Sequence, residues 1–178
     1  MPVSNKKAQP FHYLLLVTWL TLVVLAAIYF IGLRLVLFDP TNKLQSIESN
    51  TLVKQIHQLD SLTNKDLSNA IIHFTSASCR CTQFSDDHKS AINQTAKSNN
   101  FNIFNVQLSS KNNRSIIPST PSVLLLDGTG NLLYFGPYSE GLACSQSNGL
   151  VELVMSNYKK GFNSHLIVNE AKGCYCNI

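Results

Sequence analysis

An uninterrupted stretch without a charged side chain, Tyr13–Leu33, constrains this chain more than any other feature. As an α-helix of 21 residues it would be about 31 Å long, which matches the hydrocarbon thickness of a bilayer. Tyr13 and Trp19 lie towards one end and Tyr29 lies towards the other, as in the aromatic belts of membrane helices. We therefore expect residues 13–37 to form a single transmembrane signal anchor.

The charges on the two sides of this stretch are unequal. Lys6 and Lys7 precede it, whereas Arg34 follows it and Asp39 comes soon after. Positively charged flanks are preferentially retained in the cytoplasm. We therefore expect residues 1–12 to be cytoplasmic and the rest of the chain to be exported.

A cleaved signal peptide is the alternative, because it also combines a basic start, an apolar stretch and small residues, here the two alanines of Leu25-Ala26-Ala27. The apolar stretch here is longer than that of a typical signal peptide, and it continues past the alanines without a polar segment. Its length favours an uncleaved anchor.

The charge of the remaining chain is almost balanced. Of the 14 Lys and Arg residues, Lys6, Lys7 and Arg34 flank the apolar stretch, which leaves 11 against 10 acidic residues. Charged residues make up only 13% of the chain, well below the roughly 25% of an ordinary soluble domain. No basic stripe remains that could follow a phosphate backbone, so we expect no nucleic-acid partner.

Residues 38–69 are predicted to link the anchor to the exported domain. Apolar residues recur there at near-helical spacing, at Leu44, Ile47, Leu52, Ile56 and Leu59. The spacing predicts an amphipathic helix over Asn42–Leu62 that packs on the domain. A partly helical stalk is the alternative.

Residues 70–160 alternate between strand-like and helix-like patterns. The expected order is a βαβ unit, a long loop, a β-hairpin around the turn DGTGN and a final helix, with residues 161–178 as a tail. The strands are expected at Ala70–Thr75, Phe101–Leu108, Ser122–Leu126 and Leu132–Phe135, and the helices at Cys81–Ser98 and Gly149–Lys160.

Five cysteines form two C-x-C motifs, Cys79/Cys81 and Cys174/Cys176, and a single residue, Cys144. In an oxidising compartment, structural disulfides are the ordinary use of cysteine. Cys79, however, is expected where a strand meets a helix, so the helix dipole and the neighbouring Arg80 both favour its thiolate form. A disulfide closed across one residue would be strained and readily reduced, which suits exchange better than a permanent cross-link.

Several segments resemble thioredoxins. Ile71–Cys81 resembles the strand that leads into the active-site cysteines, with Cys79 at the position of the nucleophile. Ser119–Leu126 resembles the segment that carries the cis-proline, at Pro121, and Asp127–Asn131 matches the hairpin that follows. The whole chain also resembles an uncharacterised family of membrane-anchored thioredoxin-like proteins of Gram-negative bacteria.

The resemblance implies a mixed α/β fold, in which a thioredoxin-like βαβ–ββα domain follows one transmembrane helix and an amphipathic linker helix. It also implies that Thr120 and Pro121 shape a substrate groove. An ordinary trans proline at a strand start is the alternative for Pro121. This sequence departs from thioredoxins in three ways: one residue, Arg80, separates the cysteines, Ser78 replaces a tryptophan, and His73 replaces a buried acid. These departures are compatible with a dithiol whose redox poise differs from that of thioredoxins.

The other cysteines are expected near the first motif. Cys144 follows the hairpin and should return to the same end of the sheet. The tail from Gly161 to Cys174 can span at most about 43–47 Å, enough for Cys174 and Cys176 to reach Cys79, Cys81 or Cys144. They would serve as a second redox pair or as disulfide partners.

Histidines contribute little to this interpretation. His73 is expected to pack in or near the core, with a role as ligand or base as the alternative, and His88 is expected on a helix surface. No histidine stands at a zinc-motif distance from the C-x-C motifs. Thiolate-rich sites select Cu(I) or zinc. We expect no metal or other cofactor in this domain, with Cu(I) as the alternative.

The sequence therefore predicts a single-pass inner-membrane protein with a periplasmic domain that acts in thiol–disulfide exchange. Cys79 would attack and Cys81 would resolve the mixed disulfide, with a thiol- or disulfide-containing protein as partner. A Cu(I)-handling protein and a non-catalytic domain held by disulfides are the alternatives.

Overall fold

The computed structural model describes residues 10–108, 116–141 and 149–178. The chain divides into two compact units, Met1–Arg34 and Leu35–Ile178. The first contains helix α1, Pro10–Arg34, which begins three residues before the uncharged stretch. Within it, Pro10–Gly32 is long and apolar enough to cross a membrane or act as a signal anchor, and none of this segment is buried inside the protein.

The second unit is a mixed α/β domain built on a five-stranded sheet of order β3-β2-β5-β6-β7. In chain order its elements are β1 (Val36–Leu37), α2 (Ser49–His57), β2 (Ala70–Ser76), α3 (Thr82–Ser98), β3 (Asn102–Leu108), β4 (Ser119–Thr120), β5 (Ser122–Leu126), β6 (Leu132–Gly136), α4 (Leu150–Lys159), β7 (Leu166–Ile167), β8 (Lys172–Gly173) and β9 (Cys176–Asn177).

Strand β2 lies inside this sheet. It is parallel to β3, with Ala70 opposite Asn102, and antiparallel to β5, with Ile72 opposite Leu124. Strand β5 is antiparallel to β6, and β6 is parallel to β7. Because both of its faces are covered, β2 reads as a nearly continuous apolar segment rather than as an alternating one.

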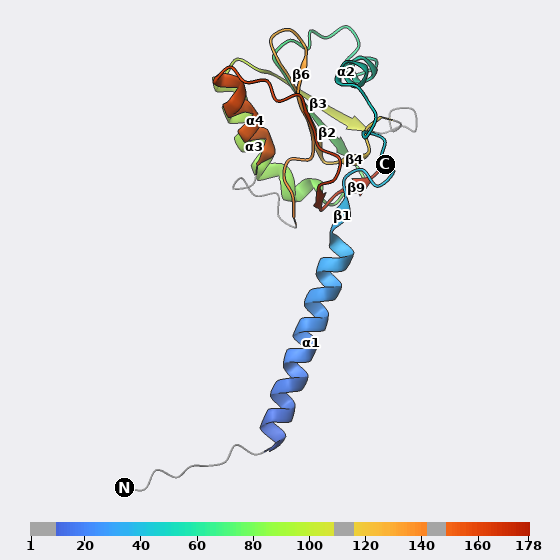
Figure 1. Cartoon of the computed structure of the whole chain (residues 1–178), viewed down its shortest axis with the longest axis vertical. Helices are drawn as coiled ribbons and strands as arrows, with labels where there is room; N and C mark the ends of the chain where they lie inside the picture. The colour runs from blue at the N-terminus through green and yellow to red at the C-terminus, as the bar shows by residue number, and fades with distance from the viewer. Residues whose placement is uncertain (1–9, 109–115, 142–148) are drawn as a thin grey trace, which may run out of the picture. The chain divides into compact units, whose positions relative to one another are not determined.

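The domain has three layers (Figure 1). Helices α3 and α4 cover one face of the sheet, where Ile71 of β2 packs in a cluster with Ile92 and Val154. Helix α2 and the turns around it cover the other face, where Ile72 packs in a second cluster with Ile56. The side chains of β2 alternate between these layers, so His73 lies on the same side as Ile71.

The linker helix expected over Asn42–Leu62 is wrong in extent, because only Ser49–His57 is helical. Before α2, both carboxylate oxygens of Asp39 accept main-chain N–H groups, from Lys43 at 3.0 Å and Leu44 at 2.7 Å, and this arrangement holds a turn. Leu44 and other apolar residues outside α2 are nevertheless buried against the sheet. The apolar periodicity therefore correctly predicted which side chains of this segment pack against the domain. The segment is part of the domain rather than a stalk.

The C-terminal tail, residues 161–178, also belongs to this domain. Strand β7 extends the main sheet, β8 pairs with β1, and β9 pairs with β4. Strands β4 and β9 lie side by side next to the C-terminal residue (Figure 1). The sequence contains no strand signal for these three elements, because each is only two residues long.

Candidate functional site

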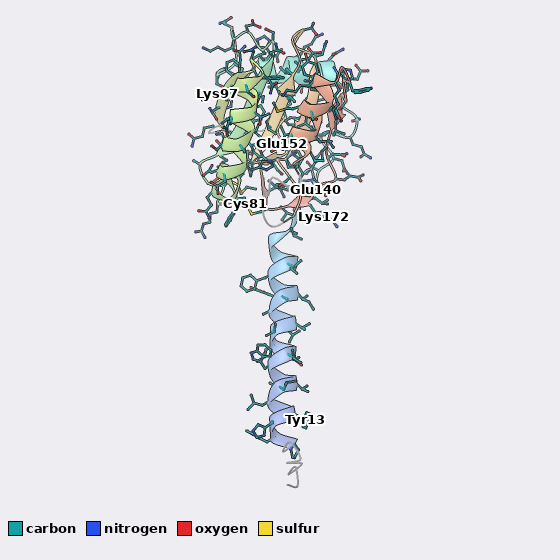
Figure 2. The ribbon with its side chains drawn as sticks, turned by 90° about the vertical axis from the view of Figure 1, so that its left-hand side faces the viewer. Tyr13, Cys81, Lys97, Glu140, Glu152 and Lys172 are labelled. Atoms are coloured by element: carbon teal, nitrogen blue, oxygen red, sulfur yellow. A yellow bond between two sulfur atoms is a disulfide. The ribbon has the colours of Figure 1, made fainter. Side chains whose placement is uncertain are left out.

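The first C-x-C motif lies where β2 gives way to α3. After β2 ends, the Cys79 N–H donates to the Ser76 carbonyl at 3.0 Å and closes a turn. Cys81 is the N-cap of α3 and lies at the end of that helix (Figure 2). Cys79 is buried, Cys81 is half-buried, and Arg80 between them is exposed. The motif therefore sits at the positive end of the helix dipole.

Two disulfides join the two C-x-C motifs. Cys79 is bonded to Cys176 and Cys81 to Cys174, and each bridge has a Cα–Cα distance of 5.6 Å. The inner cysteines of the two motifs are paired with each other, and so are the outer ones. The single-residue bridge considered from the sequence, between Cys79 and Cys81, is not the one formed.

Three of the four sulfurs form a compact group. The Sγ atoms of Cys79, Cys81 and Cys176 all lie within 4.8 Å of one another. The Cys81 sulfur is thus close to both sulfurs of the other bridge. Once the Cys81–Cys174 bridge is opened, a Cys81 thiolate would therefore lie within 4.8 Å of both sulfurs of the Cys79–Cys176 bridge.

Thr120, the residue before Pro121, contacts one of these bridges. The Thr120–Pro121 peptide bond is cis, and both residues are buried. Thr120 of β4 stands opposite Cys176 of β9 in an antiparallel pair. The Thr120 carbonyl oxygen lies 3.3 Å from Cys79 Sγ. The main chain of Thr120 therefore meets both halves of the Cys79–Cys176 bridge.

Non-covalent contacts also hold the second motif in place. The Cys174 N–H donates to the Gly141 carbonyl at 3.3 Å, and the Gly141 N–H donates to the Lys172 carbonyl at 2.8 Å. Tyr175, between the two tail cysteines, is buried, and its hydroxyl donates to the Ser139 carbonyl at 2.8 Å. Its ring packs edge-on against Phe38, with 5.4 Å between ring centroids.

Gly173 permits this arrangement. A Cβ atom there would lie 2.5 Å from the Tyr175 hydroxyl oxygen and 3.1 Å from the Gly141 carbonyl oxygen. Any side chain at position 173 would therefore displace either the Tyr175 ring or the main chain at Gly141.

His73 lies in the core and outside the sulfur group. Its Nδ1 is 2.5 Å from the Tyr138 hydroxyl, and its Nε2 is 2.8 Å from Asn93 Oδ1. Burial lowers the pKa of His73 to about 4; the Asn93 hydrogen bond opposes this shift, and the Lys89 charge adds to it. At neutral pH the ring is therefore uncharged, with Tyr138 donating to Nδ1 and Nε2 donating to Asn93.

The expectation that His88 lies on a helix surface is wrong. His88 is buried between α3 and α4, and its Nε2 lies 2.6 Å from Glu152 Oε1. Its spacing from Ile92 and Ala96, four and eight residues on, already places it on the buried face of α3. That periodicity was the signal that could have identified it.

Not every candidate residue falls in the described part of the chain. Cys144, expected near the first motif, lies outside the described residues. Cys79, Cys81, Cys174, Cys176, Thr120 and Pro121 are brought together by the tail and by the ends of β2 and β4.

Comparison with known proteins adds a family. The model of a family described as a domain of unknown function (DUF6436) matches residues 48–178. The chain belongs to the DUF6436 family. No curated protein and no solved structure matches the chain. The DUF6436 match begins just before α2 and includes both C-x-C motifs, Thr120 and Pro121, so every described residue of the candidate site lies within it.

Proposed function

We propose that this DUF6436 protein is a membrane-anchored thiol–disulfide exchange protein whose substrate is a cysteine-containing protein. The observation that carries the proposal is the group of three sulfurs within 4.8 Å, contributed by two motifs more than 90 residues apart in sequence. Thiol–disulfide exchange requires an attacking sulfur close to a disulfide, and Cys81 has that relationship to the Cys79–Cys176 bridge.

The first step is an attack on the bridge that contains Cys81. A thiolate of a partner dithiol attacks the half-buried Cys81 sulfur, the Cys81–Cys174 bond breaks, and Cys174 leaves as a thiolate. The second partner thiol then displaces Cys81 from the mixed disulfide. The partner leaves as a disulfide, and this bridge has gained two electrons and two protons.

The second step is internal. The Cys81 thiolate attacks Cys176, a new Cys81–Cys176 bond forms, and Cys79 leaves as a thiolate. Cys79 is a good leaving group, since the N-terminus of α3 and the Arg80 charge both stabilise its anion. A second dithiol then reduces the Cys81–Cys176 bond and leaves as a disulfide. The free Cys79 thiolate attacks a substrate disulfide, and one substrate sulfur leaves as a thiolate. The Cys81 thiolate attacks Cys79 in this mixed disulfide, so that the second substrate sulfur leaves as a thiolate. Run in reverse, the same steps oxidise a substrate dithiol.

The order of elements supports the proposal that the domain is thioredoxin-like. A parallel β2–α3–β3 unit is followed by an antiparallel β5–β6 pair and α4, in the strand order β3-β2-β5-β6. The cysteines follow the first strand of this series, and a cis-proline immediately precedes its third. We further propose that α1 anchors the protein in the inner membrane with its N-terminus in the cytoplasm, so that the domain lies in the oxidising periplasm, where disulfides persist.

A second candidate function, Cu(I) handling, rests on the same sulfurs. Once reduced, Cys79, Cys81 and Cys176 would offer three soft thiolate ligands from one small volume. Such ligands select Cu(I). The group found within the described residues contains only cysteines, which fits Cu(I) better than a mixed Cys/His zinc site.

One titration distinguishes exchange, Cu(I) handling and a non-catalytic domain that is permanently held by its disulfides. The full chain in detergent micelles, carrying Cys144→Ser, is equilibrated with a glutathione series with and without Cu(I), and its thiols are counted by alkylation and mass spectrometry. Exchange predicts that the bridges open and close reversibly near the periplasmic poise in the folded chain. Copper handling predicts stoichiometric Cu(I) binding that blocks alkylation. Bridges that resist reduction until the chain unfolds would overturn both proposals.

A further inference from the structure

The tail occupies a main-chain edge beside the reactive sulfurs. Strand β9 pairs with Thr120 and Ser119 of β4, and the Ile178 N–H donates to the Pro118 carbonyl at 3.0 Å. Cys176 stands opposite Thr120 in this pair and is bonded to Cys79. The tail is thus an extended peptide held on the edge of β4, with its cysteine joined to the proposed nucleophile. A partner trapped in a mixed disulfide with Cys79 would need the same place.

A pocket for an aromatic ring adjoins this edge. Tyr175 precedes Cys176 and fills the pocket, with its ring against Phe38 and its hydroxyl on the Ser139 carbonyl. Only 6% of Tyr175 is exposed. A partner segment could replace the tail in the same register. The residue before the partner's cysteine would then occupy the pocket that Tyr175 fills.

The tail's hold on the domain depends strongly on its disulfides. The two bridges span sequence separations of 97 and 93 residues, and cross-links that close loops of this size restrict the chain strongly. Without them, β8 and β9 contribute only two residues each to their pairings. Pairings this short are marginal by themselves.

We infer that the end of the tail, from β8 to β9, is a redox-released occupant of a peptide-binding edge, and that this edge binds an extended partner segment in which an aromatic residue precedes a cysteine. This inference rests on the proposed function. It adds how the exchange site is regulated and which class of partner binds there. In the oxidised chain both bridges keep the edge filled. Each bridge accepts two electrons and two protons from a dithiol, which leaves as a disulfide. The freed tail then exposes Thr120, the aromatic pocket and Cys79.

Amide hydrogen exchange of the full chain tests the release of the tail. The informative amides are those of Gly141, Cys174 and Ile178, and the amides of Asn69 and Asn102, bonded within the sheet region, are controls. Reduction should speed exchange at the first three by about tenfold or more and leave the controls unchanged. A C174S/C176S variant should behave like the reduced chain even if the bridges prove inert to dithiols, so this result is independent of the exchange chemistry. A reduced chain that keeps the three amides protected would overturn the inference.

A peptide added in trans tests the partner class. The full chain carrying C81S, C144S, C174S, C176S and Y175A retains one thiol, Cys79, and a weakened tail. Its partner is a peptide with the sequence of residues 171–178, with serine for Cys174 and its remaining cysteine activated as a mixed disulfide with thionitrobenzoate. The Cys79 thiolate attacks the peptide sulfur, and thionitrobenzoate leaves as a coloured thiolate.

The matched control is the same peptide with alanine in place of the tyrosine. Burial of the ring should make the tyrosine peptide react about tenfold faster or more, at concentrations below saturation. Equal rates would contradict the aromatic pocket while leaving exchange at Cys79 intact. A Cys79 that reacts with neither peptide would overturn the exchange function as well, so the two failures can be told apart.

Discussion

Cys176 stands opposite Thr120 in the short ladder between β9 and β4, and its sulfur is bonded to Cys79, whose own Sγ lies 3.3 Å from the Thr120 carbonyl oxygen. The chain therefore closes on itself at the point where we propose that a partner binds. A segment near the C-terminus and the junction of β2 with α3 form one site that neither could form alone.

Removal of one tail cysteine should cause the other bridge to rearrange. In a C174S variant, Cys81 is left as a thiol within 4.8 Å of both sulfurs of the Cys79–Cys176 bridge. We expect a mixture of bridges among Cys79, Cys81 and Cys176, because exchange between neighbouring sulfurs is rapid. Disulfide mapping by mass spectrometry measures the mixture.

The matched variant is C81S, which leaves Cys174 as the free thiol. Cys174 lies outside the group of three close sulfurs, so C81S should retain the Cys79–Cys176 bridge as its main form. A C174S protein with one homogeneous bridge, like that of C81S, would argue against exchange within the group.

Replacement of Gly173 by alanine should loosen the tail. The new methyl group would collide with the buried Tyr175 ring, and overpacking of this kind costs about 1–3 kcal/mol. Thermal or denaturant unfolding of the full chain in detergent should show this loss. Gly128→Ala is the control, because the nearest atom to its added Cβ would be an Asn69 side-chain oxygen at 3.5 Å, an ordinary contact. Equal stability of the two variants would contradict the described packing of the tail.

The pH dependence of stability should reflect His73. Its pKa is about 4 in the folded chain, and its ordinary value is 6.5. Between these values the unfolded chain binds more protons, so stability falls as the pH falls from about 6.5 to 4, by up to about 3 kcal/mol. A His73→Gln variant should lose most of this slope, whereas His57→Gln, at an exposed position, should keep it. Denaturant titrations across this pH range measure both slopes, and identical slopes would refute the role of His73.

The contact between α3 and α4 should depend on Glu152. Glu152→Gln weakens the hydrogen bond between residue 152 and the buried His88 ring. A poorly satisfied buried polar group lowers the free energy of unfolding by about 1–3 kcal/mol. We expect this loss in the free energy of unfolding. Glu140→Gln changes a carboxylate at an exposed position and should cost little. If the two variants were equally stable, the buried pair would contribute nothing.

The sequence predicted four of the five strands of the central sheet, all except β7, because the signals of those four strands are local. The strand expected at Ser122–Leu126 is β5 to the residue, and the helix expected at Cys81–Ser98 differs from α3 by one residue at its start. Strands β2, β3 and β6 are long enough to display their apolar patterns. Each pattern arises because the side chains that face the core recur at the regular spacing of a helix or a strand.

The site itself could be predicted only in part, because its decisive contacts are long-range. Spacing and chain reach allowed Cys174 and Cys176 to approach Cys79 and Cys81, but cysteine spacing does not determine connectivity. Strands β8 and β9 are too short to carry a periodic pattern, and nothing local marks Tyr175 as the side chain that fills a pocket beside Phe38. These features become visible only when the tail is seen on the domain.

The most direct test of the account is the rate at which dithiothreitol opens the Cys79–Cys176 bridge in the oxidised full chain. This rate is compared with the rate in a C81S variant, and both proteins carry Cys144→Ser. Hydrogen exchange at the Asn69 and Asn102 amides reports that the domain stays folded. We predict that both bridges open in the folded wild-type domain and that C81S opens Cys79–Cys176 about tenfold more slowly or worse, because the neighbouring attacking sulfur is gone. Equal rates in the two proteins, with opening only as the control amides lose protection, would contradict the account.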